Sequence, residues 1–157
     1  MKNIVLTRID DRLIHGQVVT AWTNFVNANS IIIVDDVLSK NKMMQRIYRA
    51  AAPSGIEVNI FTLEDALTYL KESDSSKKVM ILVKTPRVIK DLIDGGIEIK
   101  EVILGGMGSN AQRSQLIRNV SASDDERELM KEMIAEGIDI HFQLVPDQSK
   151  VDLNKIL

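Results

Sequence analysis

The sequence predicts an α/β fold: an open, mainly parallel twisted sheet of about seven strands with helices on both faces. Two observations lead to this prediction. Short apolar runs rich in Ile and Val alternate with helix-like segments almost throughout the chain, the pattern of parallel strands joined by helices. The chain has 157 residues, 45% of them hydrophobic and only 4% aromatic, so we expect a single domain over residues 1–157 with an aliphatic core.

The first part of the chain supplies three expected strands and two expected helices. Residues 4–6 are an apolar run that predicts a buried strand, and a helix is expected from about residue 18. Residues 30–35, SIIIVD, are strongly β-branched and predict the second strand. Residues 40–52 predict a helix that a proline ends, and residues 56–61, IEVNIF, alternate as a third strand.

The middle of the chain continues this alternation. Thr62 is expected to cap a helix that runs to about Lys71. Residues 79–83, VMILV, are fully apolar and predict a fourth strand. Residues 85–94 begin with a capping threonine and a first-turn proline and stop before two glycines, which predicts a helix. Residues 101–104, EVIL, predict the fifth strand.

The last part of the chain predicts the remaining elements. Residues 115–120 are expected to form a short sixth strand. Residues 123–137 begin with a serine cap and three acids and end at a glycine, which predicts a helix. Residues 138–145 alternate between apolar and polar side chains and predict a half-exposed edge strand, and residues 150–157 predict a short helix.

Composition excludes several classes of function. The formal net charge of −2 gives no strong attraction to nucleic acid or acidic membranes. The chain has no cysteine, which excludes disulfides, thiolate nucleophiles and cysteine-based zinc sites. No apolar run approaches the roughly 20 residues of a membrane span, and the start of the chain shows no signal peptide. We therefore expect a cytoplasmic protein that does not bind nucleic acid.

A charged segment, Arg8–Gln17 (RIDDRLIHGQ), lies between the first expected strand and the first expected helix. It is expected to be a loop at the carboxyl end of that strand, which is where ligands bind in open α/β sheets. The same edge of the sheet should gather Asp35-Asp36, Lys84-Thr85-Pro86 and Gly105–Gly108. The candidate site is therefore this edge.

His15 in this segment has the chemistry of a phosphoryl acceptor. A neutral imidazole is nucleophilic near neutral pH and can form a covalent intermediate. The guanidinium groups of Arg8 and Arg12 can hold phosphate oxygens, and the amides at the start of the following helix can add further donors. The spacing Arg-x-x-His is short and common, so spacing alone supports an ordinary charged surface loop about equally well.

The acidic pairs have less specific interpretations. Asp10 and Asp11 can bind a metal ion, orient neighbouring side chains or cap a turn. No third carboxylate with ligand spacing follows nearby, so orientation or capping is favoured over a metal site. For Asp35 and Asp36, cap and turn chemistry is favoured over positioning of the active loop.

Two further features are weak signals. Gly106-x-Gly108-x-x-Ala111 matches a dinucleotide fingerprint, but it follows the fifth strand instead of the first. A glycine turn whose amides approach an anion, or a tight turn that needs positive φ, explains it better. His141 shares a strand face with polar neighbours and is expected to be a solvated residue of the edge strand.

The string RIDDRLIHGQV at residues 8–18 resembles the arginine-rich loop, RIDxRLxHGQV, of enzyme IIB in the mannose–sorbose class of the bacterial phosphoenolpyruvate-dependent sugar phosphotransferase system (PTS). The absence of cysteine fits this histidine class, because other IIB classes use a phosphorylated cysteine. The likeness covers essentially the whole chain as one IIB unit without a fused IIA domain. It continues through Trp22, residues 32–36, Thr85-Pro86, residues 98–107 and the acidic helix start near Asp124. After Gly105-Gly106-Met107 the family varies.

This resemblance implies a phosphoryl carrier and a sugar phosphotransferase. His15 would accept phosphate from a phosphohistidine of the IIA protein, on Nδ1, and pass it to a sugar held by the membrane IIC/IID complex. Arg12 would assist transfer to the sugar, and Arg8, Asp10 and Asp11 would shape the loop and the IIA-docking surface. The residues implied in phosphate binding or loop shaping are Arg8, Asp10, Asp11, Gly16, Gln17, Gly105, Gly106 and Met107.

The resemblance also implies an open sheet with an antiparallel last strand at its edge, and a protein peripherally associated with the membrane permease. It implies no metal ion and no other cofactor. It leaves open which sugar is transported and whether the chain self-associates.

Three alternatives remain. A receiver-like signalling module phosphorylated on aspartate would also have acids after its first strand, but here the third strand ends at Phe61-Thr62 without an aspartate and the fifth at Gly105 without a lysine. A nucleotide-binding enzyme would depend on the misplaced glycine turn. A folded module with no chemistry would leave Arg8–Gln17 unexplained.

Overall fold

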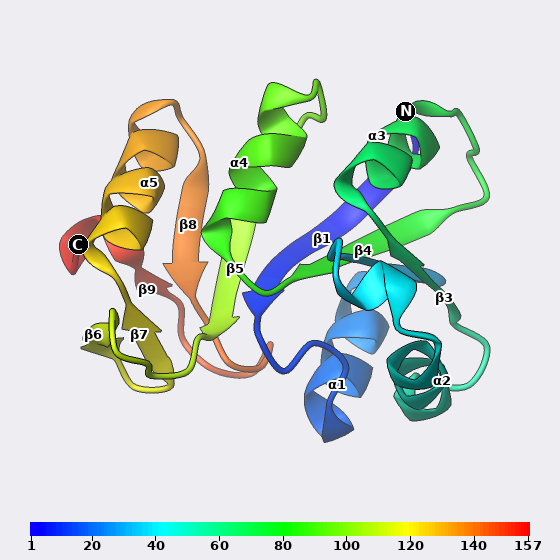
Figure 1. Cartoon of the computed structure of the whole chain (residues 1–157), viewed down its shortest axis with the longest axis horizontal. Coiled ribbons are helices and arrows are strands. Elements are labelled where there is room, and N and C mark those ends of the chain that lie inside the picture. The colour runs from blue at the N-terminus through cyan, green and yellow to red at the C-terminus, as the bar shows by residue number, and fades with distance from the viewer.

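A computed structural model describes all residues, 1–157, and places a large sheet at the centre of the chain (Figure 1). Its strands pair in parallel except the last, which is antiparallel to its neighbour. The sheet contains seven strands, in spatial order β3 (Glu57–Phe61), β2 (Ser30–Val34), β4 (Lys78–Val83), β1 (Asn3–Asp10), β5 (Glu101–Gly106), β8 (Asp139–Phe142) and β9 (Val151–Asp152). The predicted fold class is confirmed, including its antiparallel edge strand.

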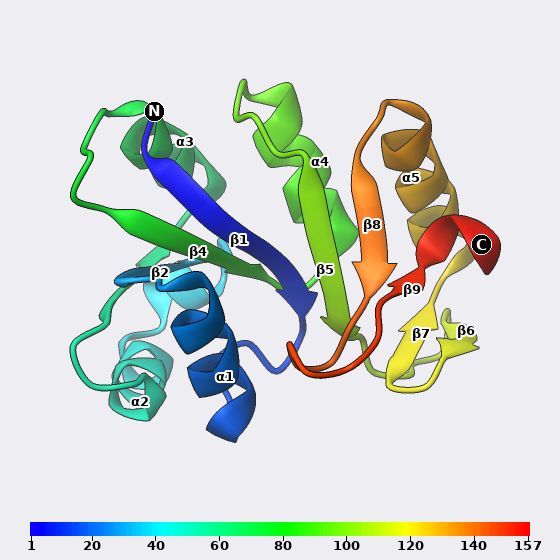
Figure 2. The same ribbon diagram turned by 180° about the vertical axis from the view of Figure 1, so that it is seen from behind.

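Helices cover both faces of the sheet. Side chains of α1 and α2 pack on one face, and those of α3, α4 and α5 pack on the other (Figures 1 and 2). The helices are α1 (Gly16–Val26), α2 (Lys42–Ala51), α3 (Leu63–Lys71), α4 (Pro86–Asp94) and α5 (Asp124–Ala135), with short 3₁₀ turns η1 (Leu38–Lys40) and η2 (Leu153–Lys155). None of them combines the length and the apolar run needed to cross a bilayer.

The central strands are apolar on both sides because both sides are covered. In β2, Ile32 joins the core under α3, α4 and α5, while its neighbours Ile31 and Ile33 join the core under α1 and α2. All three are completely buried. Burial on two faces is why this run is continuously β-branched and does not alternate with polar residues.

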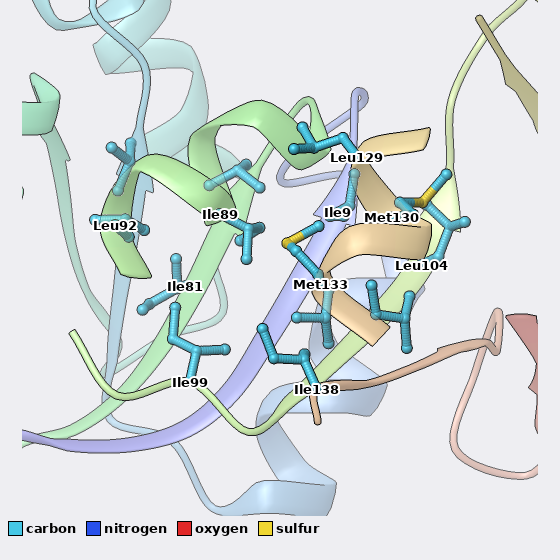
Figure 3. Packing of buried hydrophobic residues seen from close by; sticks show 14 of the residues in the cluster. Ile9, Ile81, Ile89, Leu92, Ile99, Leu104, Leu129, Met130, Met133 and Ile138 are labelled. Atoms are coloured by element: carbon cyan, nitrogen blue, oxygen red, sulfur yellow. The ribbon is translucent and has the colours of Figure 1, made fainter. Parts of the chain in front are cut away.

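The larger core lies between the sheet and the helices α4 and α5. Figure 3 shows Ile89 of α4 above Ile81 of β4, with Met133 of α5 beside them. Phe142 is the one aromatic residue among the buried members of this cluster. Unbranched methionines fill the space between the β-branched side chains. This packing fixes the orientation of the sheet and so the position of its carboxyl edge.

Two predicted helix caps are present. The Thr62 hydroxyl accepts a hydrogen bond from the backbone N–H of Asp65, with an oxygen–nitrogen distance of 3.1 Å. Ser123 and Glu126 form a reciprocal capping box at the start of α5. At α4 the helix begins at Pro86 as predicted, although the Thr85 side chain makes no capping hydrogen bond.

Three segments differ from their predictions. Residues 138–145 were expected at the edge, but β8 lies between β5 and β9, is parallel to β5 and is largely buried. The edge strand is β9, within the tail that was expected to be helical and that is a short 3₁₀ turn only at η2. An alternating pattern indicates which face of a strand is polar and not how many strands flank it, so the period alone could not place β8.

The expected sixth strand is a hairpin outside the large sheet. Strands β6 (Ser114–Ile117) and β7 (Val120–Ala122) pair antiparallel around a two-residue turn. Asn119 in that turn has φ of 67°, a left-handed conformation that asparagine tolerates. The hairpin extends the loop that follows β5.

Candidate functional site

The charged segment after residue 7 is partly a strand, which corrects the expectation of a loop. β1 continues to Asp10, so the connecting loop spans only residues 11–15 and α1 begins at Gly16. Leu13 in this loop has φ of 57° and a buried side chain that anchors the loop in the core under α1. The strand fixes Arg8 and Asp10, and the short loop brings His15 back over the end of β1.

The completely buried carboxylate of Asp10 lies at the centre of the site. Its Oδ1 accepts hydrogen bonds from the backbone N–H and from Nε of Arg12, each at 3.1 Å. Its Oδ2 lies 3.1 Å from Nη2 of Arg12, 3.4 Å from Nη2 of Arg8 and 3.1 Å from Nε2 of His15. Both oxygens are therefore engaged by cationic or ring donors, an arrangement that orients side chains instead of leaving oxygens for a metal ion.

Two opposing influences act on the pKa of Asp10. Burial of the carboxyl group works to raise it, while the hydrogen bonds from Arg12, the charge of Arg8 and the hydrogen bond with His15 lower it. The second influence prevails, so the pKa lies below its usual value. Asp10 is therefore ionised at neutral pH and keeps its hydrogen bonds.

Arg8 supports Asp10 from beneath the surface. Its side chain is 1% exposed, with Cζ 5.3 Å from the centre of the Trp22 ring. Nη1 donates to the carbonyl of Gln143 at 2.9 Å, and Nη2 donates to that of Leu144 at 3.0 Å. Burial lowers the pKa of Arg8 to about 10, with Asp10 partly opposing the shift, so the group is charged at neutral pH.

His15 is the N-cap residue of α1, and 23% of its side chain is exposed. An ionised carboxylate accepts hydrogen bonds only, so we assign the ring proton to Nε2, which faces Asp10. The lone pair then resides on Nδ1, which makes no hydrogen bond within the chain. His15 thus offers a free nucleophilic nitrogen next to the unpaired amides of the first turn of an 11-residue helix.

Arg12 is the accessible cation of the site, with 47% of its side chain exposed. Nε and Nη2 bind Asp10, whereas Nη1 has no partner within the chain. The guanidinium is therefore fixed by one edge and can donate to an anion with the other. Arg8 and Asp10, in contrast, shape the loop from below and offer no accessible side chain to a docking protein.

The glycine pair at the end of β5 makes room for the two arginines. Gly105 and Gly106 are strand residues without positive φ, so the tight-turn and anion-turn interpretations are wrong for them. A Cβ at Gly105 would overlap Nη2 and Cζ of Arg8, and a Cβ at Gly106 would lie 3.1 Å from Nη2 of Arg12. The missing side chains therefore permit the close approach of β5 to the buried guanidinium.

Asp11 connects this site to the loop after β5. Its Oδ2 accepts a hydrogen bond from the N–H of Gly108 at 2.7 Å and lies 3.7 Å from Nη1 of Arg113. The glycine turn was expected to bring an amide close to an anion, and here the amide of Gly108 binds the carboxylate of Asp11. Met107, just before this loop, is buried in the core under α4 and α5. Asp11 and Met107 thus hold the loop after β5, one by a hydrogen bond and the other by burial in the core.

Sequence reasoning missed Arg113. Its Nε and Nη2 donate to the carboxylate of Glu126 at 2.8 and 2.9 Å, and its Nη1 donates to the carbonyl of Gly108 at 2.9 Å. Burial works to raise the pKa of Glu126, but hydrogen bonds from Arg113 and Ser123 bring it below its usual value. No local pattern links Arg113 to Asp11, so only the fold reveals this contact.

The other predicted residues lie around this cluster. Gly16 begins α1 with φ of 47°, and Gln17 lines a surface cavity of about 510 Å³ between α1 and residues 145–147. Asp35 accepts hydrogen bonds from the N–H groups of Val37 and Leu38, which confirms its role in turn chemistry.

Asp36 accepts a hydrogen bond from the N–H of Leu63. Lys84 lies 3.9 Å from Asp35, and no hydrogen bond or ion pair joins this group to His15. Asp35 and Asp36 therefore make no direct polar contact with His15.

The prediction for His141 is wrong. Because β5 and β9 flank β8, the His141 side chain is only 3% exposed instead of solvated. Neither ring nitrogen has a hydrogen-bond partner.

Comparison with known proteins shows the family of this chain. Residues 4–157 match the family model described as "PTS system sorbose subfamily IIB component". The chain is 31% identical over 149 residues to the N-acetylgalactosamine-specific phosphotransferase enzyme IIB component 1 of Escherichia coli K12, covering 94% of each. It is 30% identical over 155 residues to the mannose-specific EIIAB component of the same strain, covering 98% of this chain and 48% of that protein. The IIBSor domain of the sorbose permease from Klebsiella pneumoniae superposes with a TM-score of 0.93 at 30% identity, covering 98% and 94% of the two chains.

Proposed function

The chain belongs to the sorbose subfamily of PTS IIB components, which are phosphotransferases, and from this premise we propose that it carries a phosphoryl group on Nδ1 of His15. One observation carries the proposal. Nε2 of His15 lies 3.1 Å from the buried carboxylate of Asp10, which leaves Nδ1 as the free nucleophile. The residues 1–157 act in this proposal as one IIB unit.

Phosphoryl transfer occurs in two steps. In the first, the P–N bond of a phosphohistidine on the IIA protein breaks and a P–N bond forms at Nδ1 of His15. The ionised Asp10 holds the ring while this bond forms and stabilises its positive charge. In the second step, a sugar hydroxyl oxygen forms the P–O bond while the P–N bond at Nδ1 breaks, so Nδ1 regains its lone pair. The hydroxyl proton passes to water.

The surrounding groups supply charge and position. Nη1 of Arg12 and the first amides of α1, at Gly16 and Gln17, face the transferred group and stabilise its negative charge. Arg8, through Asp10, sets the orientation of the imidazole. These fixed donors supply electrostatic stabilisation of the transferred charge, so the proposed steps require no metal ion.

Three further elements preserve this geometry. Gly105 and Gly106 make room for the arginines, and Met107 anchors the start of the following loop in the core. In this proposal Gly105, Gly106 and Met107 maintain the geometry of the site and do not contact the phosphoryl group.

PTS IIB components work between a IIA protein and the membrane IIC/IID permease. We propose the same partners here, with the chain at the cytoplasmic side of that permease. Relatives of this chain are named for N-acetylgalactosamine and for mannose at nearly equal identity, so the sugar is set by the permease partner in this proposal.

The test is phosphorylation of the purified chain by phosphoenolpyruvate, the general PTS enzymes and a class-matched IIA. We expect acid-labile, base-stable phosphate on a peptide that contains His15. The variant His15→Ala should accept none. The matched control is His141→Leu, which removes the only other histidine and should accept phosphate normally.

Other products of the same experiment would contradict the proposal. Undiminished labelling of His15→Ala would exclude His15 as the acceptor. Hydroxylamine-sensitive phosphate on Asp10 or Asp11 would indicate a receiver-like module instead. Nitrogen-15 NMR of the phosphorylated ring distinguishes Nδ1 from Nε2, and phosphate on Nε2 would refute the assigned tautomer.

A further inference from the structure

The second histidine of the chain lies in a polar cluster far from His15. Glu101 and Asp139 are the first residues of β5 and β8 and are directly paired in the parallel register. His141 follows two residues later on the same face of β8. Figure 2 shows β5, β8 and β9 side by side. Glu101 and Asp139 stand at the amino ends of β5 and β8, whereas His15 is at the carboxyl edge of the sheet.

The His141 ring is buried without a partner. Its side chain is 3% exposed, and neither Nδ1 nor Nε2 makes a hydrogen bond. Nδ1 faces Oδ1 of Asp139 at 3.6 Å, so the ring points into the acidic pair. Buried polar atoms in folded proteins nearly always have a hydrogen-bond partner. Where the chain supplies none, a bound ion is one recognised explanation.

We propose that Glu101, Asp139 and His141 bind a divalent transition-metal ion of the Zn²⁺ type. One donor atom from each residue can be chosen so that all three lie within 4.8 Å of one another. Ligands at zinc bond lengths of roughly 2.0–2.2 Å lie about 3.3 Å apart, close to the separation of Nδ1 and Asp139. The carboxylates of Glu101 and Asp139 are 49% and 58% exposed, so their rotamers are free to complete the approach.

The donor set selects the class of metal. Imidazole nitrogen suits zinc and its neighbours in the first transition series, whereas calcium and magnesium prefer sites made of oxygen alone. Two carboxylates neutralise a dication, and three protein ligands leave a position for water. The half-exposed carboxylates of Glu101 and Asp139 let an ion reach the cluster from solvent.

Two charged side chains, Lys150 and Asp152, lie next to the proposed metal ligands. Nζ of Lys150 lies 3.8 Å from Oε2 of Glu101 and must move away when the ion binds. Asp152 of β9 stands opposite His141, but its Oδ1 accepts a hydrogen bond from the N–H of Asn154 and is not counted as a ligand. Removal of the Lys150 charge should therefore strengthen metal binding, a result that a purely structural role of the cluster would not produce.

The test is calorimetric titration of untagged, metal-free protein with Zn²⁺, supported by the absorption spectrum of Co²⁺. We expect one ion per chain. Glu101→Gln and Asp139→Asn should each weaken binding about tenfold or more, and His141→Leu should abolish it. Lys150→Ala should bind more tightly. The matched control is Glu98→Gln, an exposed carboxylate that pairs with Lys100 instead and should leave binding unchanged.

His15→Ala separates this site from the proposed phosphoryl site. It should still bind one ion, because no residue is shared between the two clusters. Loss of the ion in His15→Ala with retention in His141→Leu would overturn the proposal, as would the absence of saturable binding to the wild-type chain. Circular dichroism of each variant confirms that the fold is intact, and the exposed Glu101 and Asp139 give variants that do not disturb the core.

Discussion

The two histidines of this chain occupy opposite ends of the sheet and differ in what surrounds them. His15 is partly exposed, and one of its nitrogens is held by a carboxylate that two arginines also bind. His141 is buried, and both of its nitrogens lack a partner. Burial alone therefore does not indicate which histidine is chemically prepared. The difference lies in whether one ring nitrogen has a carboxylate partner, because that partner leaves the other nitrogen free to react.

The charges around the rings differ in sign. Around His15 the accessible group is the cation Arg12, because the anion Asp10 is buried beneath it. Around His141 the accessible groups are the carboxylates Glu101 and Asp139. The first environment favours a phosphoryl group and the second favours a metal cation.

The largest expected effect follows from Asp10→Asn. The change leaves Arg8 buried without a counter-charge, which should cost about 3–5 kcal/mol of unfolding free energy. An amide can also donate to Nε2 and shift the ring proton to Nδ1, so phosphate acceptance should fall on the order of 10⁴-fold. Urea denaturation and the time course of labelling measure the two effects.

The matched control for this variant is Asp139→Asn, whose side chain is 58% exposed beside His141. In metal-free buffer it should change neither stability nor phosphate acceptance appreciably. Equal loss in both variants would show that the two histidine environments do not differ as described.

Arg12→Gln should separate the two steps of transfer. Acceptance from IIA should remain measurable because Asp10 and Arg8 still orient His15. Transfer to the sugar should fall about 10²–10³-fold, the usual effect of removing one donor to developing charge. The two half-reactions are assayed separately, and equal loss of both would contradict the role given to Arg12.

Gly105→Ala tests the close approach of β5 to Arg8. The added methyl overlaps the guanidinium and should destabilise the protein by about 1–3 kcal/mol, as overpacked sites do. Gly106→Ala is the control, because its Cβ would only lie close to Arg12 and Asp10, so its cost should be smaller. The denaturation midpoint of Gly105→Ala should be lower than that of Gly106→Ala, and the reverse order would contradict the close approach of β5 to Arg8.

Lowering the pH should remove the stabilising contribution of the ionised Asp10 carboxylate. The pKa of Asp10 is lower in the folded chain than in the unfolded chain, so its contribution to stability is complete above the unfolded value of about 4. That contribution is lost as the pH falls from there through the folded pKa. Urea midpoints should be level from pH 7 to about 5 and decline below about 4, and Asp10→Asn should show a shallower decline.

The smallest effect is expected for His141→Leu in metal-free buffer. Replacing a buried ring without partners by an apolar side chain should leave stability unchanged or raise it by up to about 1 kcal/mol. A clear loss of stability measured by the same denaturation would indicate that His141 makes a favourable interaction with Asp139 in the absence of metal.

Much of the fold could be predicted from local patterns. The apolar runs placed the strands of the parallel sheet in the correct order along the chain, and Thr62 and Ser123 cap helices as predicted. The position of β8 could not be predicted. Its alternation of polar and apolar side chains is the same whether the polar face meets water or a cluster such as Glu101 and Asp139.

The sequence indicates where the candidate site lies along the chain, but it does not indicate which of its side chains are buried. The segment Arg8–Gln17 contains the residues that cluster around Asp10 in the structure, yet nothing in the segment distinguishes the buried Arg8 from the exposed Arg12. That difference depends on the carbonyls of Gln143 and Leu144, which are more than 130 residues away. Gly105 carries no signal of its own, because its function is the space it leaves for Arg8.

The contacts of Arg8 also set an order of events during synthesis. The guanidinium finds its acceptors only at residues 143 and 144, and the indole of Trp22 donates to the same Leu144 carbonyl at 2.9 Å. A nascent chain that has not yet emerged beyond this point contains His15 but has no means of holding Arg8. The ribosome therefore delivers His15 well before the residues whose carbonyl groups hold Arg8 in place.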